Sequence, residues 1–216
     1  MQLDVISDTV CPWCYIGKKR LDKAMDAWDR KDVAIDLTWR PYQLDATIPA
    51  EGVDRQKYYE RKFGAERAKE AGKVIAEYGE MEGINFAFDK IKRSPNTLDS
   101  HRLIRWAGTA GVQMDAVELL FKRYFEEGAD IGESQVLLEV AADVGMDADL
   151  VRDLLASDAD RQKVEYEDHM AREMGVTGVP CFLFENKFSV MGAQDVDTLT
   201  KVFTRVQTRL VEQATA

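Results

Sequence analysis

The chain has 216 residues, of which 45% are hydrophobic, and a formal net charge of −10 at neutral pH. This length can bury a full core, as one domain or as a domain with a large insertion. No apolar run approaches the roughly 18 residues of a membrane span, and the N-terminus lacks the basic and apolar regions of a signal peptide. Phosphate binding depends on Lys and Arg, so the acidic balance argues against a nucleic-acid partner. We therefore expect a cytoplasmic protein that binds neither nucleic acid nor a membrane.

The first 40 residues predict a β-α-β unit. The apolar run Leu3–Ile6 predicts a strand, and Trp13–Asp29 carries apolar residues at helical spacing. Apolar and polar residues then alternate over Val33–Trp39, as in a half-buried strand, which we expect to end at Arg40-Pro41.

The middle of the chain is predicted to be helical. A loop over Pro41–Asp54 is followed by helical patterns from residue 55 to about residue 174, divided by turn signals. This block is much longer than the dozen or so residues that a crossover between parallel strands needs. Its clearest helices are predicted over Asp99–Ala110, Met114–Phe125, Val136–Val144, Asp147–Ala156 and Asp158–Met174.

Strand character returns only near the C-terminus. Pro180–Phe184 and Phe188–Met191 predict two strands joined by a turn at Asn186-Lys187, and a final helix is expected over Val196–Val211. The whole order is therefore a β-α-β unit, a helical block and a β-β-α unit.

Cys11-Pro12-Trp13-Cys14 lies where the first strand leads into the first helix, a context that favours redox chemistry for a C-x-x-C motif. With Cys11 at the N-cap, Pro12 suits the first helical position. Free N–H groups and the helix dipole then stabilise a thiolate, and in such motifs the thiol pKa falls from about 8.5 to roughly 3.5–7.5. We predict Cys11 as the nucleophile and Cys14 as the resolving thiol.

A structural zinc site is the alternative reading of the same two cysteines. Such a site needs four Cys or His ligands in total, and the remaining candidates are Cys181, His101 and His169. These residues are scattered through the sequence, so we predict no metal site.

Tryptophan and lysine side chains near the motif could have either a structural or a functional role. Trp13 is expected to be exposed and to contact substrate, whereas the tryptophans on apolar faces are expected in the core. Lys18 and Lys19 add positive potential near Cys11 in one reading, and in the favoured one are solvated lysines of the helix surface. The core tryptophans are Trp28, Trp39 and Trp106.

Several motifs together resemble the FrnE-like group of the DsbA-family thiol–disulfide oxidoreductases. The resemblance spans nearly the whole chain and extends to 2-hydroxychromene-2-carboxylate isomerases and kappa-class glutathione transferases, which typically carry serine at the nucleophile position. The motifs are Ser7-Asp8-x-x-Cys11-Pro12-Trp13-Cys14-Tyr15-Ile16-Gly17-Lys18, Arg40-Pro41 with Glu51-Gly52, Pro95-Asn96-Thr97, His101-Arg102-Leu103, Tyr124-Phe125-x-x-Gly128-x-Asp130-Ile131-Gly132, Gly178-Val179-Pro180 and Gly192-Ala193-Gln194.

The resemblance implies an α/β thioredoxin fold interrupted by a large all-helical insertion. Residues 1–40 and 176–216 would form the thioredoxin-like domain, and residues 41–175 the insertion domain. It also implies that the Val179–Pro180 peptide is cis and lies beside the cysteines, where Val179 pairs with an extended substrate. We expect the substrate to contact Pro12, Trp13, Val179, Pro180 and, in the cleft beside the insertion, His101.

Cys181 departs from the apolar or aromatic residue expected after the proline. We favour the interpretation that Cys181 is a small buried hydrophobic residue of a strand. If its side chain instead faces Cys11 and Cys14, it could act as a third thiol or as a ligand of a soft metal. His169 is assigned no role.

These features predict a thiol–disulfide oxidoreductase that exchanges a disulfide with a protein or a small molecule. Its redox-active disulfide requires no further cofactor, and glutathione or a thioredoxin system is the expected electron partner. Two alternatives stay open. One is a glutathione-dependent isomerase or transferase acting on an aromatic or polyketide-like molecule, and the other is a non-catalytic, chaperone-like binding module.

Overall fold

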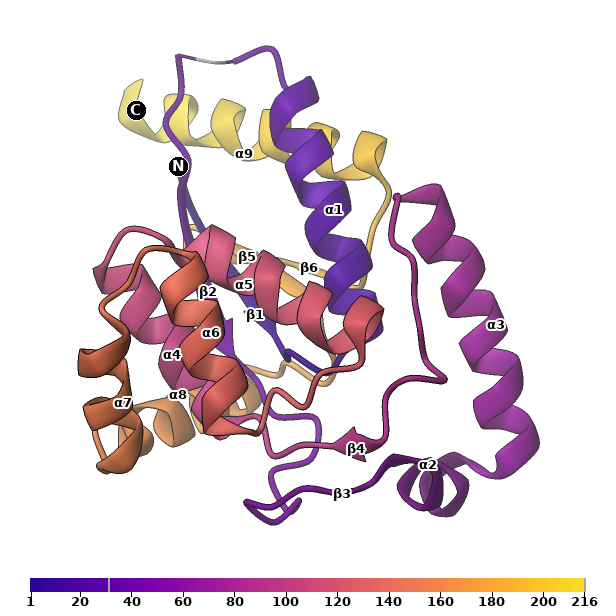
Figure 1. Ribbon diagram of the computed structural model, residues 1–216. Helices are drawn as coiled ribbons and strands as arrows, with labels where there is room; N and C mark the ends of the chain where they lie inside the picture. Colours follow the sequence, from indigo (N-terminus) through magenta and orange to yellow (C-terminus); the bar gives the residue numbers. More distant parts are fainter. Residues whose placement is uncertain (31, 216) are drawn as a thin grey trace.

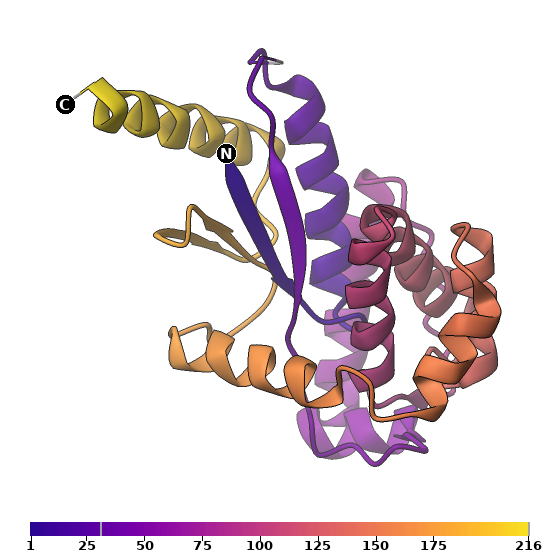
Figure 2. The same ribbon diagram turned by 90° about the vertical axis from the view of Figure 1, so that its left-hand side faces the viewer.

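The computed structural model describes residues 1–30 and 32–215 and is built around a four-stranded sheet (Figures 1 and 2). The strands are β1 (Gln2–Ser7), β2 (Asp36–Pro41), β5 (Cys181–Phe184) and β6 (Phe188–Met191), in the order β2-β1-β5-β6. β1 runs parallel to β2 and antiparallel to β5, which in turn pairs with β6 in antiparallel fashion. The predicted β-α-β and β-β-α units are therefore confirmed and share one sheet.

Two helices cover one face of the sheet. Helix α1 (Pro12–Ala27) contacts α9 (Val196–Thr215), and Figure 1 shows α9 crossing α1. Their buried side chains join those of β1 and β5 in the main core, where Trp28 packs against Phe203 with ring centroids 5.4 Å apart. Sheet residues of this core include Leu3, Val5, Phe182 and Phe184.

The opposite face of the sheet carries a smaller apolar cluster. Ile6 and Cys181 are paired in register next to the pair Val5 and Phe182, and neighbouring residues of a strand point to opposite faces. The smaller cluster includes Ile6, Tyr42, Ala171, Val176 and Cys181. Ala171 belongs to α8 (Arg161–Glu173), so α8 contributes to covering this face.

Most helices lie in the chain between β2 and β5. They are α2 (Arg55–Phe63), α3 (Ala65–Met81), α4 (Leu98–Thr109), α5 (Gln113–Lys122), the π-helix η1 (Arg123–Glu127), α6 (Ser134–Asp143), α7 (Ala148–Ala156) and α8. A second, two-stranded sheet pairs β3 (Val53–Asp54) with β4 (Arg93–Ser94). In Figure 1, α2 and α3 form one side of the molecule and α4 to α8 lie on the other.

The outer edge of β2 is closed by a side chain instead of a strand. The Trp39 N–H donates to Gln113 Oε1 at 2.8 Å, and Gln113 Nε2 lies 3.4 Å from the Trp39 carbonyl oxygen, which it donates to. The amide of Gln113 thus imitates one residue of a neighbouring strand.

Arg102 joins α4 to the end of α7 and to the connection between α7 and α8. Its side chain is fully buried, and its guanidinium donates to the carbonyl oxygens of Leu154, Ser157 and Ala159 at 2.6–2.7 Å. It also pairs with Asp99 at 2.8 Å. The connection between α7 and α8 is therefore fixed to α4 by one side chain.

Several sequence predictions about boundaries are wrong. β2 begins at Asp36, three residues after the expected Val33, and it ends at Pro41, within the expected Arg40-Pro41, where an edge strand tolerates proline. The predicted helical block is interrupted after α3 by an extended segment that contains β4, and α9 extends beyond the expected Val211 to Thr215.

Within residues 1–30 and 32–215, none of the helices combines the length and apolar character required to cross a membrane.

Candidate active site

Cys11 and Cys14 lie at the beginning of α1, directly after the turn that follows β1. Cys11 is the N-cap residue with extended backbone (φ −92°, ψ 111°), and Pro12 is the first helical residue. The Cys11 N–H donates to the Asp8 carbonyl oxygen at 3.0 Å, and the Cys14 N–H donates to the Cys11 carbonyl oxygen at 3.0 Å. The predicted placement of both residues at the helix N-terminus is confirmed.

The two cysteines are free thiols in unequal surroundings. Cys11 retains 4% of its surface and Cys14 retains none. Burial, and then the adjacent Cys11, raise the pKa of the Cys14 thiol, whereas hydrogen bonds from the Asp8 N–H and the Ser7 side chain act in the opposite direction. Cys14 is therefore held as a neutral thiol beneath Cys11.

The Val179–Pro180 segment lies against this helix start. Its peptide bond is cis, and the Cys11 thiol lies 3.7 Å from the Val179 carbonyl oxygen, to which it donates. Gly17 permits the close approach, because a Cβ atom built there would lie 2.8 Å from Pro180 Cγ. The structure thus brings together Cys11, Cys14, Val179 and Pro180, as the resemblance implied.

The expectation that Trp13 is exposed is wrong. Trp13 and Pro12 are half-buried, and the indole packs against Tyr78 of α3 with ring centroids 5.4 Å apart. The expectation for the other tryptophans is confirmed, since Trp28, Trp39 and Trp106 are all buried.

The favoured reading of Lys18 as a solvated lysine is also wrong. Only 7% of its side chain is exposed, and its Nζ lies 2.7 Å from Asp22 and 2.9 Å from Glu118 of α5. Lys19 is partly buried and pairs with the same Glu118. The two lysines connect α1 to α5 through ion pairs with Glu118. The charges of Glu118 and Asp22 offset the positive potential near Cys11 that we considered for Lys18 and Lys19.

His101 is buried, and its partner is an acidic residue of the turn before Cys11. Its Nε2 lies 3.4 Å from Asp8 Oδ1, and both side chains are almost fully buried. Asp8 belongs to the sequence motif that begins at Ser7, which assigned it no role of its own. Its contact with a helix some 90 positions later is not visible in any local pattern.

The remaining candidates of the zinc alternative lie apart from the cysteine pair. Cys181 belongs to the apolar cluster on the opposite face of the sheet, where burial raises its pKa to about 11. His169 is largely exposed on α8 beside Glu173. Cys181 thus matches its reading as a small buried hydrophobic residue, and the structure does not turn it towards Cys11.

Tyr59 of α2 is a site residue that sequence analysis missed. Burial raises the pKa of Tyr59, Arg55 opposes this shift, and the nearby Cys11 and Asp8 add to it. Tyr59 also lines a recess of about 60 Å³ together with Asp8, Val10, Tyr58 and Phe63. This recess is a small aromatic pocket at the edge of the cysteine site.

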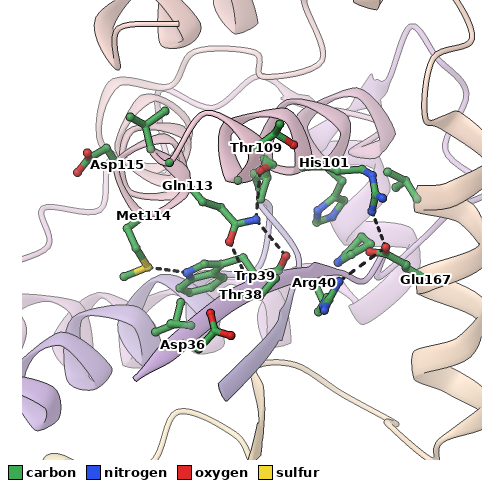
Figure 3. A pocket seen from close by; sticks show the side chains of 18 residues that line it. Asp36, Thr38, Trp39, Arg40, His101, Thr109, Gln113, Met114, Asp115 and Glu167 are labelled. Atoms are coloured by element: carbon green, nitrogen blue, oxygen red, sulfur yellow. Dashed lines mark hydrogen bonds and ion pairs between the residues drawn. The ribbon is translucent and has the colours of Figure 1, made fainter. Parts of the chain in front are cut away.

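A larger cavity of about 490 Å³ lies along β2, with walls from α4, α5 and α8 (Figure 3). Its lining combines His101, Trp39 and Gln113 with the charged side chains of Arg40 and Glu167. His101 therefore lies between this cavity and Asp8.

Comparison with known proteins shows the family. A family model described as a DSBA-like thioredoxin domain matches residues 2–204. The chain belongs to this family, whose members include thiol–disulfide oxidoreductases. The fold predicted from the sequence is confirmed.

Two individual proteins are similar to this chain over most of its length. The uncharacterized protein YwbO of Bacillus subtilis (strain 168) is 24% identical over 211 residues, which is 96% of this chain and 98% of that protein. The crystal structure of a probable DsbA oxidoreductase from Streptomyces coelicolor is 27% identical, with a TM-score of 0.88 over 96% of this chain and 90% of that one.

Two more distant structures share the fold. A 2-hydroxychromene-2-carboxylate isomerase is 20% identical, with a TM-score of 0.70 over 99% of both chains. The cytosolic disulfide reductase DsbM of Pseudomonas aeruginosa, in a structure with glutathione, is 16% identical, with a TM-score of 0.69 over 96% of this chain and all of that one.

Proposed function

We propose that the protein is a thiol–disulfide oxidoreductase of the FrnE-like type in which Cys11 is the nucleophile and Cys14 the resolving thiol. The observation that carries the proposal is the position of Cys11, which caps α1 and lies 3.7 Å from the Val179 carbonyl oxygen, with the fully buried Cys14 in the first turn of the same helix. A thiolate at Cys11 is stabilised by the dipole of α1, because Cys11 lies at the N-terminus of this helix.

The reaction proceeds in two exchanges. The Cys11 thiolate attacks a substrate disulfide, forming a mixed disulfide and releasing one substrate thiol. Cys14 then attacks Cys11 Sγ, the mixed disulfide breaks, and the second substrate thiol leaves. The two cysteines lose two electrons and two protons, which appear in the two substrate thiols. The reverse direction delivers a disulfide to a dithiol.

The substrate is a protein or small-molecule disulfide that docks against Pro12, Trp13 and the Val179-Pro180 edge. Glutathione is a suitable electron partner, since a disulfide reductase of the same fold has been solved with it. We place the exchange in the cytoplasm, where glutathione and thioredoxin keep most thiols reduced and a C-x-x-C motif serves catalysis rather than permanent bridging.

The first experiment is a titration of the purified protein in glutathione buffers of graded redox poise, with free thiols alkylated and counted by mass. We expect one two-electron transition confined to Cys11 and Cys14. In Cys14→Ser, oxidised glutathione should accumulate on Cys11 as one glutathionyl adduct, whereas Cys11→Ser should accumulate none. The absence of any transition would refute the proposal.

The double variant Cys11→Ser/Cys14→Ser separates this proposal from the two alternatives. Thiol–disulfide exchange should disappear from it. Isomerisation of a chromene substrate or suppression of aggregation that survives in the double variant would favour the isomerase or the binding module instead.

A further inference from the structure

The cavity along β2 lies apart from the cysteine pair and takes no part in the proposed exchange. Its volume is about 490 Å³, within the roughly 300–1,000 Å³ of pockets that hold small molecules. Its lining, taken over residues 1–30 and 32–215, includes neither Cys11 nor Cys14 nor the cis Pro180. A ligand of this cavity is therefore a different molecule from the disulfide substrate.

The two ends of the cavity differ in charge. Figure 3 shows Asp36 and Asp115 at one end, and Arg40, His101 and Glu167 at the other. Both aspartates are exposed, and neither carboxylate has an ion-pair or hydrogen-bond partner among the described residues. Two unpaired carboxylates at one end of a cavity attract a positive charge. This end therefore suits the ammonium group of a ligand.

The opposite end carries two arginines with unused donors. Arg40 Nε donates to Asp4 at 3.0 Å, and its Nη1 lies 3.8 Å from Glu167. Arg105 Nη1 donates to the same Glu167 at 2.5 Å, and its Nε lies 3.5 Å from Asp160. These acidic partners hold both guanidinium groups in place, and neither Nη2 group donates a hydrogen bond to another described residue. The free Nη2 groups suit a carboxylate, which guanidinium groups bind well.

His101 adds an unsatisfied buried side chain to the arginine end. The residue exposes 4% of its surface, and its Nε2 is buried without a hydrogen-bond partner. Asp8 Oδ1 lies 3.4 Å from this nitrogen, which is longer than the roughly 2.7–3.2 Å of a hydrogen bond to nitrogen. Buried polar groups in proteins nearly always have partners, so an imidazole without one in a cavity wall points to a ligand.

Leu37 offers a backbone contact between the two ends. The Trp39 N–H and C=O face the outer edge of β2, where Gln113 binds them, and residues two apart in a strand direct these groups to the same edge. Asp36 fits this alternation, because its N–H donates inwards to the Met1 carbonyl oxygen at 2.8 Å. The N–H and C=O of Leu37 therefore face the outer edge, and no part of the described chain bonds to them. They are free to pair with one peptide unit of a ligand.

The distance between the two ends matches the length of a short peptide. Asp36 and Arg40 are four residues apart on β2, which corresponds to about 13 Å at about 3.3 Å per residue. An extended peptide of about four residues covers a similar distance from its amino group to its carboxylate. Gln113 already occupies the edge at Trp39, so a long strand cannot be added there.

We propose that this cavity binds a short peptide of about four residues with free termini. Its amino group lies at Asp36 and Asp115, one of its peptide units pairs with Leu37, and its carboxylate lies at Arg40 and Arg105. The inference goes beyond the proposed function and does not depend on it, because neither cysteine takes part.

The test is isothermal titration calorimetry of the reduced protein with alanine peptides. We expect tetra-alanine to bind with one-to-one stoichiometry. Acetylation of its amino group removes the positive charge, and amidation of its carboxyl group removes the negative charge. Each change should weaken binding about fivefold or more, because hydrogen bonds to charged groups are the strong ones. Dialanine reaches only one end of the cavity and should bind more weakly by a similar factor.

Variants of each end connect the binding to the cavity. Asp36→Asn/Asp115→Asn should weaken tetra-alanine about fivefold or more and the acetylated peptide less than about twofold, because the acetylated peptide has no ammonium group to lose. Arg105→Gln should weaken tetra-alanine and spare the peptide amide in the same way, and the amide tests this end in the parent protein should the variant fail to fold. Asp149→Asn and Arg152→Gln are the matched controls on α7, where 88% and 58% of the two side chains are exposed, and should bind like the parent.

Three results would overturn the peptide site. One is the absence of saturable binding up to about 10 mM tetra-alanine. Another is binding within about twofold of the parent in both cavity variants or with both blocked peptides. The third is loss of binding in Cys11→Ser/Cys14→Ser, which would place the peptide at the cysteine site. We expect this double variant to bind tetra-alanine normally although it cannot exchange disulfides, so the two proposals fail separately.

Discussion

Replacing Arg102 by Met should weaken the fold strongly. Arg102 is fully buried, and the neutral side chain removes the donors that serve the carbonyl oxygens of Leu154, Ser157 and Ala159. It also leaves Asp99 without its closest cation. Met preserves much of the apolar stem, so the expected loss comes from polar groups and not from a cavity.

The magnitude follows from the hydrogen bonds. A bond to a charged group contributes about 1.5–3 kcal/mol, and breaking a buried ion pair costs about 3–5 kcal/mol. Ser157 is exposed and Asp99 is 32% exposed, so water replaces part of the lost bonding. We therefore expect a loss near the lower limit, about 3 kcal/mol, or roughly 6–12 °C in Tm for a chain of this size.

Urea and thermal unfolding followed by circular dichroism measure this loss. Arg152→Ala is the control, because Arg152 lies on α7 and pairs with Asp149 at the surface, where 58% and 88% of the two side chains are exposed. Such pairs contribute little, so its unfolding should match that of the parent. A loss below about 1 kcal/mol in Arg102→Met would show that the buried guanidinium is not what holds α7 and α8 to α4.

Further predictions concern the cysteine site and the sheet behind it. Gly17→Ala should lower stability and slow the reaction of Cys11 with disulfides, since the new Cβ lies 2.8 Å from Pro180 Cγ, whereas Gly72→Ala in α3 has nothing within 4 Å and should be neutral or stabilising by up to about 1 kcal/mol in urea unfolding. Cys181→Ala should leave the redox titration unchanged, and a shifted midpoint would contradict the placement of Cys181 across the sheet. Burial raises the pKa of Cys181 to about 11 in the folded protein, compared with about 8.5 in the unfolded chain. The contribution of this shift to the free energy of unfolding is complete below about pH 8.5 and is lost progressively as the pH rises towards 11. Unfolding free energies of the parent should therefore fall over this range more steeply than those of Cys181→Ala, and parallel curves would refute the linkage.

Local sequence patterns predict the bounds of a helix or strand well where one face of that element packs against the core. β6 was predicted with its observed bounds and α1 to within two residues, because strand alternation and helical spacing both report burial by neighbouring elements. The extended segment after α3 was missed because β3 and β4 are two residues each and depend on pairing between distant parts of the chain.

The sequence predicted those parts of the site whose residues are adjacent in the chain. Cys11, Pro12 and Cys14 form one motif, and their place at the helix start follows from the strand before them. Lys18 is buried because Glu118, 100 positions later, pairs with it, and Trp13 is half-buried because Tyr78 packs on it. Helical periodicity cannot show such partners, since it describes one helix without the helices that cover it.

The side-chain amide that closes the edge of β2 also bears on self-association. An open edge strand presents unpaired N–H and C=O groups that template the addition of a strand from another molecule. Gln113 occupies both groups of Trp39 and donates as well to the Ile104 carbonyl oxygen at 3.2 Å, so it is held in place from α4. The polar side chain of Gln113 thereby protects the outer edge of the sheet at Trp39 against the addition of a strand from another molecule, the first step towards aggregates, while the cavity beside it stays open to water.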